Sequence, residues 1–183
     1  MKTKKLIAFI LLFCLTLIFV PTAWAAENSY TINGVTITPT SVVSSDSDLH
    51  SCASYATAVL KAIGKWTPGM TSYSSSYSIL AGKSAEERKI TADHVREFIQ
   101  AASVGSRIRV CSVSDTTGNN CDQILTGGNG HTMVLVEKND SSGTFTILEA
   151  VTGDNGKYYA RSKSYTYQSF AKAMDRGMAE NFV

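Results

Sequence analysis

The order of its hydrophobic patterns constrains the fold of this chain more than any other feature. Two helical patterns come first, at residues 52–63 and 91–102, with apolar residues spaced three and four apart. Strand patterns of alternating or short continuous apolar residues then follow, at 107–112, 131–138, 144–151 and 158–164. A last helical pattern covers residues 166–174. This order predicts an α+β fold, in which N-terminal helices pack on an antiparallel sheet formed by the C-terminal half.

Polar segments separate these patterns. Residues 26–45 are rich in Ser and Thr and contain Asn33-Gly34, which favours a hairpin turn, so we expect a short strand or an ordered arm there. The Ser/Tyr-rich tract at 72–78 is expected to be an exposed loop. Residues 46–183 are expected to form one domain, since a chain of 183 residues with 44% hydrophobic composition can bury a single core.

The first 25 residues have the pattern of a secretory signal peptide. Residues 1–5 are basic, residues 6–20 are apolar apart from Thr16, and Ala23-Trp24-Ala25 places small residues before a cleavage site. An uncleaved anchor is the alternative, but the apolar run is shorter than the roughly 20 residues that span a bilayer. We therefore expect a mature protein that is secreted or lies at the cell surface, without membrane contact.

Charge and motif content exclude several partners. The formal net charge of +2 falls by three, to −1, when Lys2, Lys4 and Lys5 leave with the signal peptide. A near-neutral chain without a Lys/Arg cluster does not favour nucleic-acid binding. The three histidines are not spaced as metal ligands, and the Gly-rich segment 127–130 precedes a strand and not a helix, unlike a phosphate-binding loop. We expect a monomer with no metal or organic cofactor.

Three cysteines remain after removal of Cys14, and an odd number leaves one free thiol in an exported protein. Cys111 and Cys121 flank a short polar segment and are the expected disulfide pair. Cys52 is then the free thiol. It is either a buried, inert residue or a reactive one.

The position of Cys52 favours a reactive thiol. Ser51 is a suitable N-cap and Gly64 a suitable residue after the helix end, so Cys52 lies in the first turn of its helix. The partial positive charge at a helix N-terminus favours the thiolate, which is the nucleophilic form. The Cys52 backbone N–H can also stabilise an oxyanion.

A nucleophilic thiol needs a base and a group that orients the base. His131 begins a strand directly after the Gly-rich segment and is the preferred base. His50, two residues before the thiol, is the alternative, while His94 lies in the first turn of an amphipathic helix and is expected at the surface.

Strand pairing supplies a candidate third residue. If Lys138 faces Thr144 across the hairpin turn, Glu149 lies on the same sheet face as His131, one step along. Its carboxylate can then accept the Nδ1–H of His131, whereas an exposed strand glutamate is the other possibility. A register slip of one residue would move Glu149 to the opposite face.

These residues resemble the papain-like cysteine hydrolases of bacteria, which include the CHAP amidohydrolase/peptidase domains and the NlpC-type cell-wall hydrolases. The resemblance covers about residues 46–174 and is carried by three segments: Ser51-Cys52-Ala53-Ser54-Tyr55-Ala56, Gly130-His131-Thr132-Met133-Val134-Leu135-Val136 and Thr146-Ile147-Leu148-Glu149-Ala150.

The resemblance implies a papain-like fold, with Cys52 as nucleophile, His131 as base and Glu149 as the polar third residue. It also implies cleavage of amide bonds through an acyl-enzyme, in a peptide or a peptidoglycan-like substrate. Ser47 and His50 are candidates for the second oxyanion donor, and Tyr55 for lining the substrate groove. Two alternatives stay open: an acyl transferase on the same scaffold and a catalytically silent secreted binding domain.

Overall fold

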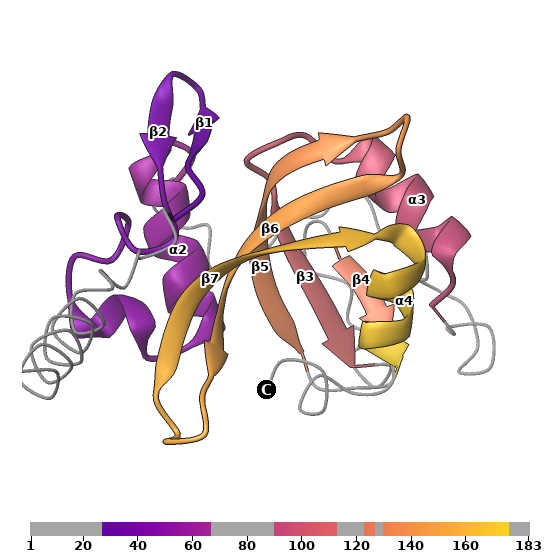
Figure 1. Ribbon diagram of the computed structural model, residues 1–183. Coiled ribbons are helices and arrows are strands. Elements are labelled where there is room, and N and C mark those ends of the chain that lie inside the picture. Colours follow the sequence, from indigo (N-terminus) through magenta and orange to yellow (C-terminus); the bar gives the residue numbers. More distant parts are fainter. Residues whose placement is uncertain (1–26, 67–89, 113–122, 127–129, 176–183) are drawn as a thin grey trace, which may run out of the picture.

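A five-stranded sheet lies between two helical layers (Figure 1). The computed structural model describes residues 27–66, 90–112, 123–126 and 130–175. The predicted signal peptide and the Ser/Tyr-rich tract 72–78 lie outside these ranges. In the part of the chain that is described, no helix is long and apolar enough to cross a membrane.

The sheet has the strand order β4-β3-β5-β6-β7 and is built from β3 (Arg107–Ser112), β4 (Gln123–Thr126), β5 (His131–Asn139), β6 (Thr144–Thr152) and β7 (Tyr158–Thr166). The pairs β3–β5, β5–β6 and β6–β7 are antiparallel, which confirms the predicted α+β class and the antiparallel C-terminal half. The edge strand β4 was not predicted and pairs in parallel with β3. Four residues give too short a pattern to identify a strand from its periodicity.

The helices cover both faces of the sheet. On one side lie α2 (Cys52–Ala62) and the small hairpin of β1 (Tyr30–Ile32) and β2 (Val35–Ile37). On the other side lie α3 (Ala92–Ala101) and α4 (Tyr167–Asp175). Each face therefore has its own hydrophobic cluster. Alternate strand residues enter opposite clusters, so both sets of strand side chains are buried.

The N-terminal arm belongs to the core. Asn33 and Gly34 have φ values of 52° and 77°, as a two-residue hairpin turn requires, which confirms the turn predicted for this segment. Ile32 and Ile37 on either side of the turn are buried in the cluster that contains α2. A short 3-10 helix, η1 (Asp46–Leu49), then leads directly to α2.

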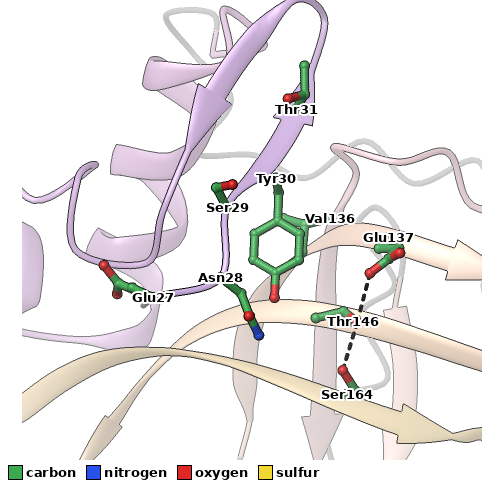
Figure 2. Close-up of a pocket in the computed structure, with 9 residues that line it drawn as sticks. All are labelled: Glu27, Asn28, Ser29, Tyr30, Thr31, Val136, Glu137, Thr146 and Ser164. Atoms are coloured by element: carbon green, nitrogen blue, oxygen red, sulfur yellow. Dashed lines mark hydrogen bonds between the residues drawn. The ribbon is translucent and has the colours of Figure 1, made fainter. Parts of the chain in front are cut away.

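A polar pocket of about 690 Å³ separates this arm from the sheet. The Tyr30 ring projects into it, toward the strands that carry Thr146 and Ser164 (Figure 2). The residues that line it are Glu27, Asn28, Ser29, Tyr30, Thr31, Val136, Glu137, Thr146 and Ser164. None of the candidate catalytic residues is among them, so the pocket is separate from the chemistry considered below.

The β5–β6 hairpin has the predicted register in its inner part, but not next to the turn. Next to the turn, Lys138 faces Phe145 and not Thr144, one position away from the expected pairing. A bulge between Leu135 and Glu137 absorbs one residue, and beyond it Leu135 faces Ile147 as the prediction requires. The bulge thus cancels the slip at the turn, and Glu149 keeps the face that was predicted for it.

The packing of α4 gives a test of the fold. The Phe170 ring is wholly buried, with its centroid 5.2 Å from that of Phe145 and 5.1 Å from that of Tyr165, edge-on to both. We expect Phe170→Ala to lower the free energy of unfolding by about 3–5 kcal/mol, because it leaves a cavity and removes aromatic contacts. Lys172→Ala, at an exposed position of the same helix, should change it by less than about 0.5 kcal/mol. Urea unfolding followed by circular dichroism measures both, and equal effects would contradict this packing.

Candidate active site

Cys52 is the first residue of α2, as the capping pattern predicts. The Ser51 hydroxyl accepts the Ser54 N–H at 3.0 Å, and Gly64, with φ +70°, follows the other end of the helix. The Ser54 hydroxyl in turn accepts the Ser51 N–H at 3.0 Å, which completes a reciprocal cap. Because the cap fixes where the helix begins, it also fixes the thiol at the positive end of the helix. The thiol is half-buried and in no disulfide.

The sheet opens at the point where this thiol approaches it. The pairing of β5 with β6 runs from the turn to Val134 and Leu148 and ends there, although β5 begins at His131 and β6 continues to Thr152. Beyond that point β5 pairs only with β3, and β6 only with β7. Figure 1 shows the two pairs of strands diverging below the crossing of β5 and β6. The site is built around this opening.

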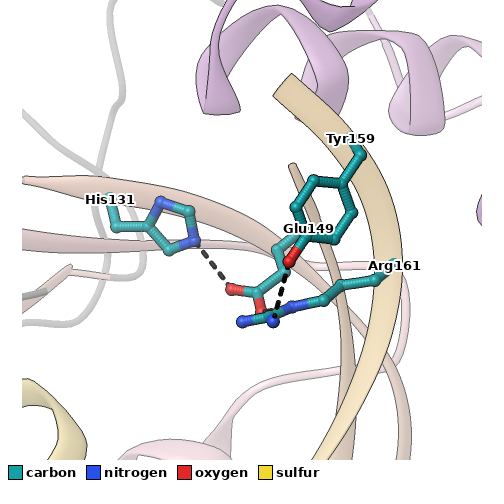
Figure 3. Close-up of polar contacts among 4 residues, drawn as sticks. All are labelled: His131, Glu149, Tyr159 and Arg161. Carbon is teal, nitrogen blue, oxygen red and sulfur yellow. Dashed lines mark hydrogen bonds and ion pairs between the residues drawn. The ribbon is translucent and has the colours of Figure 1, made fainter. Parts of the chain in front are cut away.

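The His131 side chain, at the start of β5, hydrogen-bonds with a residue of β6 across the gap between the two strands. Its ring is 6% exposed, and its Nε2–H donates to the Glu149 Oε2 at 2.8 Å (Figure 3). The ring also hydrogen-bonds with the Cys52 thiol, for which Nδ1 remains. The structure therefore brings the three predicted residues together. The expectation that Glu149 accepts from Nδ1 was wrong, because α2 approaches the ring from the Nδ1 side.

A backbone donor adds a contact to the thiol that sequence reasoning missed. The Thr132 N–H hydrogen-bonds with Cys52. The Leu135 N–H donates to the Ser106 carbonyl, on the β3 side of β5. Backbone N–H groups alternate between the two edges of a strand, so the Thr132 N–H points to the opposite edge. At that edge β6 no longer pairs with β5, and the Cys52 thiol is the hydrogen-bond partner of the Thr132 N–H in place of a backbone group of β6. No side-chain pattern reveals a contact of this kind.

Glu149 is wholly buried between two cationic side chains. Its Oε2 accepts from His131, and its Oε1 accepts from the Arg161 Nε at 2.8 Å. Arg161 lies directly opposite Glu149 in the pairing of β6 with β7. Its Nη1 lies 3.5 Å from the Tyr159 hydroxyl (Figure 3). Sequence reasoning missed Arg161, because β7 was recognised as a strand but was not placed in register with β6.

The charges of the site favour a thiolate–imidazolium pair. Burial raises the pKa of the Cys52 thiol, but the hydrogen bond and positive charge of His131, with the N–H groups of Thr132 and Ala53, outweigh it and lower that pKa overall. Burial lowers the pKa of His131, whereas Cys52 and Glu149 raise it to about 9. The thiol therefore loses its proton before the imidazolium does, so both groups are charged between their pKa values.

The remaining candidates, Ser47, His50 and Tyr55, each make a polar contact outside the Cys52–His131–Glu149 group. Tyr55 is wholly buried and donates its hydroxyl hydrogen to the Pro39 carbonyl at 2.8 Å, so it belongs to the core and not to a substrate groove. His50 is exposed, and its Nδ1 bonds with the Ser47 carbonyl. A carbonyl only accepts, so the neutral His50 ring carries its proton on Nδ1 and offers an acceptor at Nε2.

The Ser47 hydroxyl is exposed and lies 2.6 Å from the Ser45 hydroxyl. The Cys52 backbone N–H, in the first turn of its helix, has no partner within that helix and could donate to an oxyanion. The predicted Cys111–Cys121 disulfide lies outside the described residues, since only the backbone of Cys111 falls within them. Within the described ranges, no cluster of three His, Cys, Asp or Glu side chains is arranged to hold a metal ion.

Comparisons of the chain with protein-family models, with curated proteins and with solved structures found no match. Inference about its function therefore rests on the geometry of the site.

The choice of base can be tested on the thiol itself. We expect Cys52 to react with iodoacetamide with a pH midpoint below the usual range of a thiol, near 8.5. His131→Gln should move this midpoint up by about one unit or more, because the thiolate loses its cationic partner. His50→Gln should leave it unchanged.

Mass spectrometry of the peptide that contains Cys52, taken at intervals over a range of pH, gives the alkylation rate. A midpoint that moves in His50→Gln and not in His131→Gln would assign the thiol to the other imidazole.

Proposed function

We propose that this protein is a thiol-dependent acyl-transfer enzyme of papain-like architecture, in which Cys52 is the nucleophile, His131 the general acid and base, and Glu149 the group that orients His131. The observation that carries the proposal is the continuous line of contacts from the Cys52 thiol through the His131 ring to the buried Glu149 carboxylate. Such a line supplies the three components of nucleophilic catalysis: an activated nucleophile, a base and an orienting group.

Within this class, we propose a secreted amidase or peptidase that cleaves amide bonds in peptides, including those of peptidoglycan. Three features support a papain-like architecture: the thiol opens a helix, the helix packs on an antiparallel sheet, and the histidine and its carboxylate partner come from neighbouring strands. The signal-peptide pattern of residues 1–25 supports a site of action outside the cytoplasm.

In the first half of the reaction, the Cys52 thiolate attacks the amide carbonyl carbon, a C–S bond forms, and the carbonyl oxygen takes the negative charge. The Cys52 N–H, at the N-terminus of α2, stabilises this oxyanion. The His131 imidazolium then gives its Nδ1 proton to the leaving nitrogen, the C–N bond breaks and the amine departs. The product on the protein is a thioester, and His131 is left neutral.

In the second half, neutral His131 accepts a proton from water, and the resulting hydroxide attacks the thioester carbonyl. A C–O bond forms, the C–S bond breaks, and the carboxylic acid leaves. The proton stays on His131 and the charge returns to the thiol, which restores the starting ion pair. Glu149 accepts from Nε2 throughout, so Nδ1 is the nitrogen that exchanges protons.

Loss of the thiol tests the proposal directly. We expect Cys52→Ala to lower the rate of amide cleavage by at least about 10³-fold while leaving the fold unchanged, because no other group forms the acyl-enzyme. The assay incubates purified peptidoglycan, and separately a mixture of peptides, with the protein and identifies new amino and carboxyl ends by mass spectrometry. Cleavage by Cys52→Ala at the wild-type rate would overturn the proposal.

The same assay separates hydrolysis from the two alternatives. A labelled amine added to the reaction is incorporated into the product if an acyl transferase is at work, whereas water alone resolves the thioester in a hydrolase. A thiol with ordinary reactivity and no cleavage of either substrate would indicate a silent binding domain.

The pH dependence of the rate follows from the directions of the two pKa shifts. The active form requires thiolate and imidazolium together, so kcat/KM should be bell-shaped. It should fall at acid pH as the thiol, with its lowered pKa, takes up a proton. It should also fall above about pH 9 as His131 loses its proton. A rate that rises with pH through 9 would show that neutral His131, and not the ion pair, is the active form.

A further inference from the structure

We propose that Arg161 is a positioning residue for the catalytic reaction, which holds the buried Glu149 carboxylate in place and directs one of its oxygens at His131. This inference deepens the proposed function and rests on it. The Arg161 side chain would act through Glu149 and His131 on the thiol, without touching the substrate carbonyl. Arg161 lies outside all three segments that carry the sequence resemblance.

The contacts of Glu149 divide its two oxygens between two partners. The Arg161 Nε donates to Oε1, and the His131 Nε2 donates to Oε2, each at 2.8 Å. With both oxygens taken by donors on opposite sides, the carboxylate cannot rotate without losing one bond. Glu149 and Arg161 also face each other directly in the β6–β7 ladder, so the strand pairing itself sets their separation.

The burial of Glu149 makes a second cation necessary. A wholly buried carboxylate takes up a proton unless cations or hydrogen-bond donors compensate for the loss of water. His131 alone does not keep a constant positive charge beside Glu149, because in the proposed reaction it gives up its Nδ1 proton in each catalytic cycle. The guanidinium of Arg161 keeps its charge at every working pH and so stabilises the ionised carboxylate while the imidazole is neutral.

Arg161 is itself held in place. Its side chain is 23% exposed, its guanidinium carbon lies 6.0 Å from the centre of the Tyr159 ring, and Nη1 lies 3.5 Å from the Tyr159 hydroxyl. Figure 3 shows the guanidinium beside the carboxylate, on the side of Glu149 away from the His131 ring. An arginine anchored between a carboxylate and an aromatic ring has little freedom to leave its partner.

Other titratable groups also face Glu149 and enter the test. They come from α2, β5 and β7 and comprise Tyr55, His131, Lys163 and Tyr165, each of which interacts with Glu149 by charge. Of these, Lys163 supplies the matched control. It is a second cation on the same face of β7, two residues from Arg161, and it acts on Glu149 by charge, while its ammonium lies 5.2 Å from the centre of the Tyr165 ring.

The experiment measures the alkylation rate of Cys52 against pH in the wild type and in Arg161→Met, Arg161→Lys, Lys163→Met and Glu149→Gln. In Arg161→Met the buried carboxylate loses the donor at Oε1 and should no longer hold the imidazolium in place. The midpoint for the thiolate should therefore move up by about one unit or more, with about a tenfold lower rate on the acid side.

Comparison with three other variants distinguishes a specific role of Arg161 from a general loss of positive charge. Arg161→Met should move the midpoint in the same direction as Glu149→Gln, and by no more than that variant does. Arg161→Lys should recover part of the shift, because an ammonium restores the charge without the planar donor geometry. Lys163→Met should move the midpoint much less. The acid limb of kcat/KM should move with the thiol in every variant.

Failure of this inference can be told apart from failure of the proposed function. If the wild-type thiol has an ordinary midpoint, the proposed function itself fails. If the wild-type midpoint is low and Arg161→Met keeps it, with or without a loss of thermal stability, Arg161 has only a structural role and the positioning inference is overturned. A shift in Lys163→Met as large as that in Arg161→Met would overturn it as well.

Discussion

The burial of the Glu149 carboxylate is the constraint on which the rest of the site depends. Removing a carboxylate from water costs several kcal/mol, and the molecule offsets this with a cation at each oxygen. With the thiolate included, the side chains form a row of alternating charge: Cys52 negative, His131 positive, Glu149 negative and Arg161 positive. These four charges cancel, so the thiolate is accommodated without a net charge at the site.

The opening of the sheet is what allows this row to form. Glu149 and His131 project from the face that packs on α3 and α4, whereas the thiol arrives on α2 from the opposite face. In a continuous sheet these groups would be separated by the backbone of β5 and β6. Because the pairing of the two strands ends at Val134 and Leu148, the helix N-terminus reaches the imidazole and a backbone N–H of β5 through the gap.

Local sequence rules were sufficient for the parts of the site that depend on local structure. The capping residues around α2 located Cys52 at a helix start, and the Gly-rich segment located His131 at a strand start. Features that depend on how elements distant in the sequence pack together could not be predicted from local patterns. Arg161 required the register of β7 on β6, the choice of His131 nitrogen required the direction from which α2 arrives, and the edge strand β4 required a parallel partner. Glu149 was placed on the right face although the assumed turn pairing was one residue off, because the bulge restored it.

That bulge has an evolutionary consequence. It divides the β5–β6 hairpin into an outer part, whose alignment follows the turn, and an inner part, whose alignment the two hydrophobic clusters impose on alternate residues. Residues 140–143 lie in the outer part, at the end of the hairpin farthest from the thiol. Drift in the length or composition of this tip can therefore be absorbed before it reaches the inner strands.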